Sequence, residues 1–102
     1  MRFQLVLKCP AASLKNFDEI VGLEGVLIAK FSDQNEVDGH DFGSSEANIF
    51  VLTDDPHRTF DEAKNILSGH RLWPDLKIAY RQVNGTEYHV LWPEHTTRFD
   101  VR

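Results

Sequence analysis

One stretch decides the fold: Val37-Asp38-Gly39-His40-Asp41-Phe42-Gly43-Ser44-Ser45-Glu46-Ala47-Asn48-Ile49-Phe50-Val51-Leu52-Thr53-Asp54-Asp55-Pro56. Its apolar part, Ala47 to Thr53, is short and rich in β-branched and aromatic residues, which is typical of a strand covered on both faces. The preceding Val37 to Phe42 alternates weakly and predicts an exposed edge strand, joined to the apolar one through Gly43 to Glu46. Thr53-Asp54-Asp55-Pro56 then predicts a helix start, because proline suits the first helical position and Asp54 or Asp55 can accept bonds from free amides.

The residues before this stretch predict a strand and a helix. Arg2 to Lys8 alternates and predicts a short strand. From Ser13 to Phe31 apolar residues recur every three or four positions, which predicts one long helix with Ser13 as its N-cap. Gly22 and Gly25 weaken a helix interior, so a shorter helix followed by a strand at 26–31 stays open as the alternative. We favour the single helix, because the apolar spacing continues through both glycines.

The residues after the stretch predict a helix and a hairpin. Pro56 to Ser68 has the apolar spacing of a second helix, and the connection after it is expected to be anchored by Leu72 and Trp73. Leu76 to Val83 and Thr86 to Trp92 are strand-like and flank Asn84-Gly85, a dipeptide that favours a two-residue type I′ turn. That turn would set these cross-strand pairs: Tyr80 with His89, Arg81 with Tyr88, and Ile78 with Leu91. The pattern leaves open which hairpin face is buried.

The element order is therefore β-α-β-β-α-β-β. This order predicts an α+β fold of the ferredoxin-like sandwich type, with a mostly antiparallel sheet and two helices on one face. Residues 1–102 are expected to form a single domain, in which the polar residues 94–102 form a tail that can fray.

Composition narrows the class of protein. The chain has 102 residues and a net charge of −5, and the scattered lysines and arginines argue against nucleic acid as a partner. A single cysteine, Cys9, cannot form an internal disulfide, which suits a reducing compartment, and we expect it to be buried rather than reactive. Neither an export signal nor a segment of transmembrane length is visible. These features predict a cytoplasmic protein that does not span a membrane.

The strongest candidates for chemistry lie in the hairpin loop of the decisive stretch. Asp38, His40, Asp41 and Glu46 are residue types that bind metals or transfer protons. A second acidic group, Asp54 to His57, lies at the other end of the same strand, about 20 Å away, so the two groups cannot form one site. With one histidine in the loop, the pattern predicts turn and capping bonds rather than a metal or catalytic site. We expect no cofactor.

The hairpin supplies a second group of candidate binding residues. Aromatic residues and arginine concentrate at protein interfaces, and this hairpin carries five such candidates: Tyr80, Arg81, Tyr88, His89 and Trp92. The alternative is that Trp92 and one tyrosine simply belong to the core.

The decisive stretch also carries a motif. Its run Gly-His-Asp-x-Gly-Ser-x-Glu-x-Asn-Ile-Phe, followed by Thr-Asp-Asp-Pro, resembles a group of small bacterial proteins with no established activity. The short segments Tyr80-Arg81 and Leu91-Trp92-Pro93 resemble segments of the same group. Ser45 stands where that group often has glycine. The resemblance implies the same fold, and it implies no chemistry.

Taken together, these features favour a non-enzymatic protein-binding domain. The acidic balance suits a basic partner, and the most specific hypothesis is an immunity-type inhibitor of a bacterial toxin or enzyme. Homodimerisation through sheet faces or edges is a companion expectation. The alternative is a small-molecule enzyme or ligand sensor that uses His40, Asp41 and Glu46, which would require these side chains to converge on a concavity.

Overall fold

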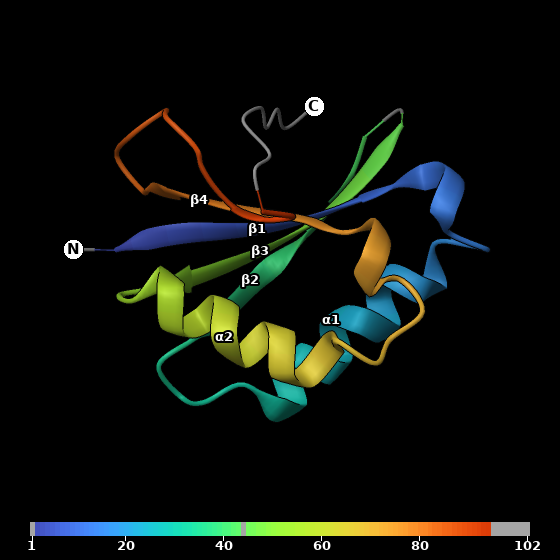
Figure 1. Ribbon diagram of the computed structural model, residues 1–102, viewed down its shortest axis with the longest axis horizontal. Coiled ribbons are helices and arrows are strands. Elements are labelled where there is room, and N and C mark those ends of the chain that lie inside the picture. Colours follow the sequence, from blue (N-terminus) through green and yellow to red (C-terminus); the bar gives the residue numbers. More distant parts are fainter. Residues whose placement is uncertain (1, 44, 95–102) are drawn as a thin grey trace.

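The computed structural model describes residues 2–43 and 45–94 (Figure 1). These residues form the following strands and α-helices: β1 (Phe3–Pro10), α1 (Asp18–Lys30), β2 (Glu36–Phe42), β3 (Glu46–Thr53), α2 (Pro56–Leu67), β4 (Lys77–Gln82) and β5 (His89–Trp92). Two short 3-10 turns, η1 (Ala11–Ser13) and η2 (Trp73–Asp75), precede α1 and β4. The α+β class agrees with the sequence-based prediction. The predicted tail at 94–102 lies, beyond Glu94, outside the described residues.

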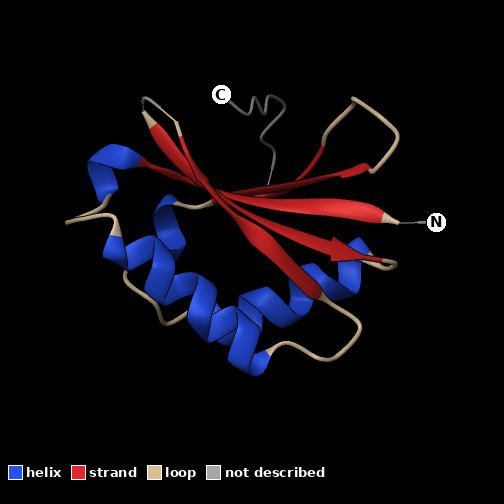
Figure 2. Cartoon of the chain, turned by 180° about the vertical axis from the view of Figure 1, so that it is seen from behind, coloured by secondary structure: helices blue, strands red, loops and turns tan. Residues whose placement is uncertain are grey.

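The strands form one sheet in the order β2-β3-β1-β4-β5, and every neighbouring pair is antiparallel. β1 lies at the centre, where Leu7 faces Ile49 of β3 on one side and Ile78 of β4 on the other. β3 is an interior strand and β2 is the edge strand beside it, as predicted from their patterns. Figures 1 and 2 show α1 and α2 together on one face of this sheet.

The main core lies between that face and the two helices. Its fully buried members come from all layers of the fold: Leu5, Leu7, Ile20, Leu23, Leu27, Ile49, Val51, Leu67, Leu72 and Ile78. A smaller cluster lies on the opposite face, where the buried Val6 and Ala79 pack against Phe50, Tyr88 and Val90. Strand β4 of the C-terminal hairpin thus buries one residue on each face, Ile78 toward the helices and Ala79 on the other side.

Helix α1 passes through Gly22 and Gly25 without interruption, so the single-helix prediction is confirmed over this part and the alternative strand at 26–31 is wrong. The predicted start at Ser13 is also wrong. The helix begins at Asp18, after the η1 turn and an N-cap position occupied by Phe17. One reason is tertiary, because Arg71 donates a hydrogen bond to the Ser13 carbonyl at 3.2 Å and also bonds Glu19. These contacts hold the chain before the helix in a non-helical path.

The connection between β4 and β5 differs from the predicted two-residue turn. β4 ends at Gln82 and β5 starts at His89, and a turn forms at 82–85, where the Gly85 amide donates to the Gln82 carbonyl at 2.9 Å. Tyr80 faces His89 as predicted, but a register shift after Ala79 places Trp92, not Leu91, opposite Ile78.

Helix α2 begins as predicted. Pro56 is its first residue, and the Asp55 carboxylate accepts a hydrogen bond from the Arg58 amide at 3.1 Å. The predicted anchoring of the following connection is confirmed as well, since Leu72 and Trp73 are buried.

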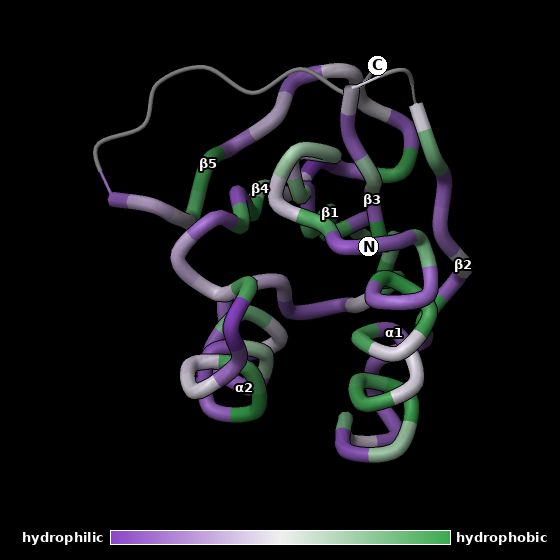
Figure 3. The backbone as a smooth tube through the Cα atoms, turned by 90° about the vertical axis from the view of Figure 1, so that its right-hand side faces the viewer, coloured by the Kyte–Doolittle hydropathy of each residue, from purple (hydrophilic) through white to green (hydrophobic). Residues whose placement is uncertain are grey.

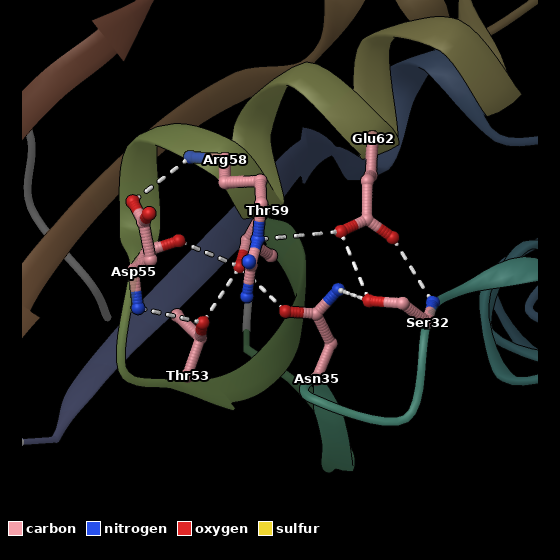
Figure 4. Close-up of polar contacts among 7 residues, drawn as sticks. All are labelled: Ser32, Asn35, Thr53, Asp55, Arg58, Thr59 and Glu62. Carbon is pink, nitrogen blue, oxygen red and sulfur yellow. Dashed lines mark hydrogen bonds and ion pairs between the residues drawn. The ribbon is translucent and has the colours of Figure 1, made fainter.

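A polar network ties the start of α2 to the loop that follows α1 (Figure 4). The buried Thr59 hydroxyl lies 2.6 Å from Oδ1 of Asn35 and 2.7 Å from Oγ1 of Thr53. One turn further, the Glu62 carboxylate accepts hydrogen bonds from the Ser32 amide and hydroxyl, both at 3.0 Å. Although partial burial acts against it, these bonds lower the pKa of Glu62 below its ordinary value. The network is therefore structural and fixes the α1–β2 loop on α2.

Candidate functional site

The three loop residues His40, Asp41 and Glu46 do not converge. His40 pairs with Ile49 in the sheet and so faces the helices, where its Nδ1 lies 3.1 Å from both carboxylate oxygens of Glu24 on α1. Asp41 pairs with Asn48 and lies on the opposite face, because successive residues of a strand alternate between faces. The sheet thus separates the histidine from both carboxylates.

Glu46 lies on the helix-free face in a small polar cluster. Its side chain accepts a hydrogen bond from Nδ2 of Asn48 at 3.2 Å and lies 3.7 Å from the Lys8 ammonium. The other amide atom, Oδ1 of the fully buried Asn48, has no hydrogen-bond partner in the described part of the chain. A shallow pocket of about 170 Å³ beside the cluster is lined by Lys8, Pro10, Ser45, Glu46 and Lys77. Because two groups already engage Glu46, its carboxylate is a structural element rather than a free base.

Tyr80 and His89 belong to a stack of rings on the helix side of the sheet. The Tyr80 ring stacks on His89 at 5.1 Å and meets His57 edge-on at 5.4 Å, with its hydroxyl 3.4 Å from Nε2 of His57. His57 comes from the first turn of α2, and nothing in the sequence pattern pairs it with Tyr80. The stack orders the hairpin against the start of α2.

Arg81 and Tyr88 lie on the other side of the hairpin and have intramolecular roles. The Arg81 guanidinium donates hydrogen bonds to the carbonyls of Gln82, Val83 and Gly85 at 3.1, 2.9 and 3.1 Å. Tyr88 packs on the small buried cluster around Val6. Arg81 therefore holds the wide 83–88 connection in place of the predicted type I′ turn.

Trp92 belongs to the core. Its ring stacks on Trp73 at 5.1 Å, lies near Phe60, and is covered by the Lys64 ammonium at 5.7 Å. Its buried Nε1 has no hydrogen-bond partner among residues 2–43 and 45–94. Of the two interpretations that the sequence allowed for Trp92, the structure supports the core one.

Cys9 is buried, as expected, and its environment suppresses reactivity. Burial first, and then the nearby charges of Asp75 and Glu19, raise the pKa of the thiol to about 11. A thiol with so high a pKa is almost entirely protonated at neutral pH and is a poor nucleophile.

The surface feature that stands out is the free edge of the sheet. From 31 to 57 the sequence contains seven acidic residues and neither lysine nor arginine, and β2 exposes three of those acids: Glu36, Asp38 and Asp41. We call these three residues the acidic edge. Arg2 lies 3.6 Å from Glu36, whereas Asp38 and Asp41 have no ion-pair partner among the described residues. A positively charged surface on a partner protein would therefore be attracted to this edge.

An aromatic pair lies at the end of β2, on the helix side of the sheet and therefore on the other face from Asp41. Phe17, which is 62% exposed, contacts Phe42 at the end of β2 with ring centroids 4.7 Å apart. The predicted helix from Ser13 would include Phe17 among its regularly spaced apolar residues, whereas the observed helix starts one residue after Phe17, and Phe17 lies at the surface. Exposed aromatic side chains beside uncompensated charges are characteristic of protein interfaces.

The described residues contain no group of three or more histidine, cysteine or acidic side chains that could hold a metal ion. None of the helices in the described ranges is long and apolar enough to cross a membrane. No protein-family profile matches the chain, and neither curated proteins nor solved structures give a significant match.

Proposed function

We propose that this chain is a non-enzymatic protein-binding domain that docks onto a basic protein, in the manner of an immunity-type inhibitor. The observation that carries the proposal is the acidic edge on β2, together with the exposed Phe17 that contacts Phe42 at the end of the same strand. An aromatic anchor and charges of one sign along one edge of the molecule combine apolar burial with electrostatic steering. The partner then contributes lysines or arginines opposite Asp38 and Asp41.

The position of the edge supports this proposal. β2 has a neighbouring strand on one side alone, and its register shift between Val37 and Gly39, with φ of 119° at Gly39, bends the strand away from regular pairing. Bulges and charges on an edge strand discourage the addition of another strand. We therefore propose side-chain docking on this edge rather than strand addition, which disfavours the edge form of the homodimer that was expected through sheet faces or edges.

The alternative function, an enzyme or ligand sensor at His40, Asp41 and Glu46, gains no support from the geometry. The sheet separates His40 from the two acids, and Glu46 and His40 each have a structural partner.

We also propose that the fold is ferredoxin-like and that the protein is cytoplasmic. The antiparallel order β2-β3-β1-β4, with both helices on one face, supports the first, and β5 then extends the sheet beyond β4. The lone buried thiol of Cys9 supports the second.

The proposal is tested by affinity capture from native lysate with matched baits. The first bait is the natural chain, and the second carries Asp38→Asn and Asp41→Asn, which remove two charges while retaining shape. A third bait, Asp61→Asn with Glu87→Gln, removes two exposed charges elsewhere. A basic protein captured in equimolar amount by the first and third baits, and lost from the second, supports the proposal. Equal capture by all three baits, or capture of nothing, contradicts it.

A further inference from the structure

The solvent side of α1 is apolar along the middle of the helix. Between Glu19 and Lys30 the sequence has one charged residue, Glu24, and that side chain turns toward His40. At 100° per residue, the following exposed residues span roughly 120° of the helix and form what we call the outer face: Val21, Gly22, Gly25, Ile28 and Ala29. Figure 3 shows much of α1 in hydrophobic or near-neutral colours.

Two side chains of this face, Val21 and Ile28, are large and exposed. Val21 is 48% and Ile28 is 61% exposed, and apart from Val83 all the large hydrophobic residues that the structure describes as exposed lie on or directly before α1. A helix that is apolar around its whole circumference is normally buried. The inner residues Ile20, Leu23 and Leu27 are buried in the core of this chain, so the outer face needs a cover from outside it.

The two glycines point to the same conclusion. A Cβ at Gly22 or Gly25 would meet no atom within 4 Å, so nothing in this chain requires glycine there. Glycine weakens a helix interior, and alanine would serve the isolated fold better. Small residues at an exposed position allow another backbone to approach closely.

We propose that α1 packs antiparallel against α1 of a second copy of this chain, in a two-fold symmetric dimer with Gly25 at the crossing point. Val21 and Ile28 lie on one flank of Gly25, and Gly22 and Ala29 lie at nearly equal angles on the other flank. Two-fold symmetry then places Val21 of each copy against Ile28 of the other. It also places Gly22 against Ala29, where the small side chains let the helices approach.

This self-complementarity favours a second copy over a different protein. An isologous interface needs one surface that matches itself, and the outer face does so without any charge that would call for an opposite one. Its nearest charge is Asp18 in the first turn. Antiparallel packing keeps the two Asp18 side chains about 20 Å apart along the axis, beyond the screening length, whereas parallel packing would bring them together.

The area that the two α1 helices bury sets the expected affinity of the dimer. One helix face buries less than the roughly 800 Å² per partner of a standard interface, so we expect a dissociation constant on the order of 10 μM. The dimer goes beyond the proposed function, because it uses the outer face of α1 and not Asp38 or Asp41.

Sedimentation velocity of the full chain over a concentration series tests the proposal. The natural chain should rise from its monomer mass of 11.7 kDa toward twice that value. Ile28→Asp should remain monomeric throughout. Gly25→Ala should weaken the dimer about tenfold or more, while its circular dichroism spectrum stays native and its melting temperature does not fall. Val83→Asp, at the exposed hydrophobic residue remote from α1, should dimerise like the natural chain.

Either of two outcomes would overturn the proposal. A natural chain that stays at 11.7 kDa at every concentration has no such dimer. A dimer that survives both Ile28→Asp and Gly25→Ala uses another surface. Neither result affects the capture experiment with the Asp38 and Asp41 variants, so the two proposals can fail separately.

Discussion

Nδ1 of His40 lies 3.1 Å from each carboxylate oxygen of Glu24, and this contact joins the edge strand β2 to helix α1. Since a carboxylate can only accept, the histidine donates from Nδ1. Glu24 is the one charged residue in the middle of an otherwise apolar helix, and its side chain is 13% exposed. The contact with His40 explains how the helix tolerates Glu24. The same contact gives His40 a structural role.

His40→Ala is therefore expected to lower the free energy of unfolding by about 1 kcal/mol, because it leaves a largely buried carboxylate without its donor. Denaturant unfolding of the single variants and of His40→Ala with Glu24→Gln would measure the coupling. We predict that the double variant loses less than the sum of the single losses. Strict additivity would show that the two side chains do not stabilise each other.

The free energy of unfolding is expected to depend on pH through the ionisation of Glu62. Its pKa is lowered in the folded state by the hydrogen bonds from Ser32, so its stabilisation is complete above the ordinary value of 4.5 and is lost as the pH falls through the lower folded value. Glu62→Gln should cost about 1 kcal/mol at neutral pH, and the difference should shrink in acid. Urea unfolding across a pH series measures this, with the exposed neighbour Asp61→Asn as the control. A difference that is constant with pH would refute this role of Glu62.

Arg81→Met should loosen the connection at 83–88. The variant removes the donors to three carbonyls but keeps most of the apolar stem. Bonds from a charged donor are individually worth about 1.5–3 kcal/mol, although partial exposure reduces this value here. Hydrogen exchange followed by mass spectrometry should show faster exchange confined to this connection. Lys77→Met, an exposed neighbour on the same strand, should exchange like the natural chain.

Cys9 should resist thiol reagents in the native protein. Burial raises its pKa to about 11, so very little thiolate exists near neutral pH. Labelling should be slow in buffer and rapid once guanidinium unfolds the chain. Since the pKa is raised on folding, the neutral thiol stabilises the protein below its ordinary value of 9.0, and this contribution is lost as the pH rises toward 11. Fast labelling of the native state at neutral pH would contradict this account.

The sequence predicted the features that local chemistry determines. Proline at the first position of α2 and the apolar run of β3 act over a few residues and were placed correctly, and of the two acids predicted as the cap, Asp54 or Asp55, the structure uses Asp55. The helix start was misplaced because a distant group acts on it, and the last hairpin because a side chain bonds the loop backbone. Arg71 holds the Ser13 carbonyl from 58 positions away, and Arg81 binds the loop carbonyls in place of a tight turn.

The contacts of the candidate site residues were harder to predict, because they join residues that are far apart in the sequence. His40 meets Glu24 across 16 positions, and Tyr80 meets His57 across 23, so neither partner is visible in local spacing. Residue type alone placed His40, Asp41 and Glu46 together, whereas alternation along the strands divides them between the two faces. Asp38 and Asp41 were recognised as chemical candidates and their strand as an exposed edge, whereas Glu36 was not a candidate and the surface position of Phe17 was not foreseen.

The proposed function is tested most directly by the affinity of the captured partner, once purified, for the natural chain and its variants. We predict that Asp38→Asn with Asp41→Asn weakens binding about tenfold or more at low salt, and that added salt narrows the difference. Asp61→Asn with Glu87→Gln should bind like the natural chain. Equal affinity for all three proteins at every salt concentration would contradict docking through the acidic edge.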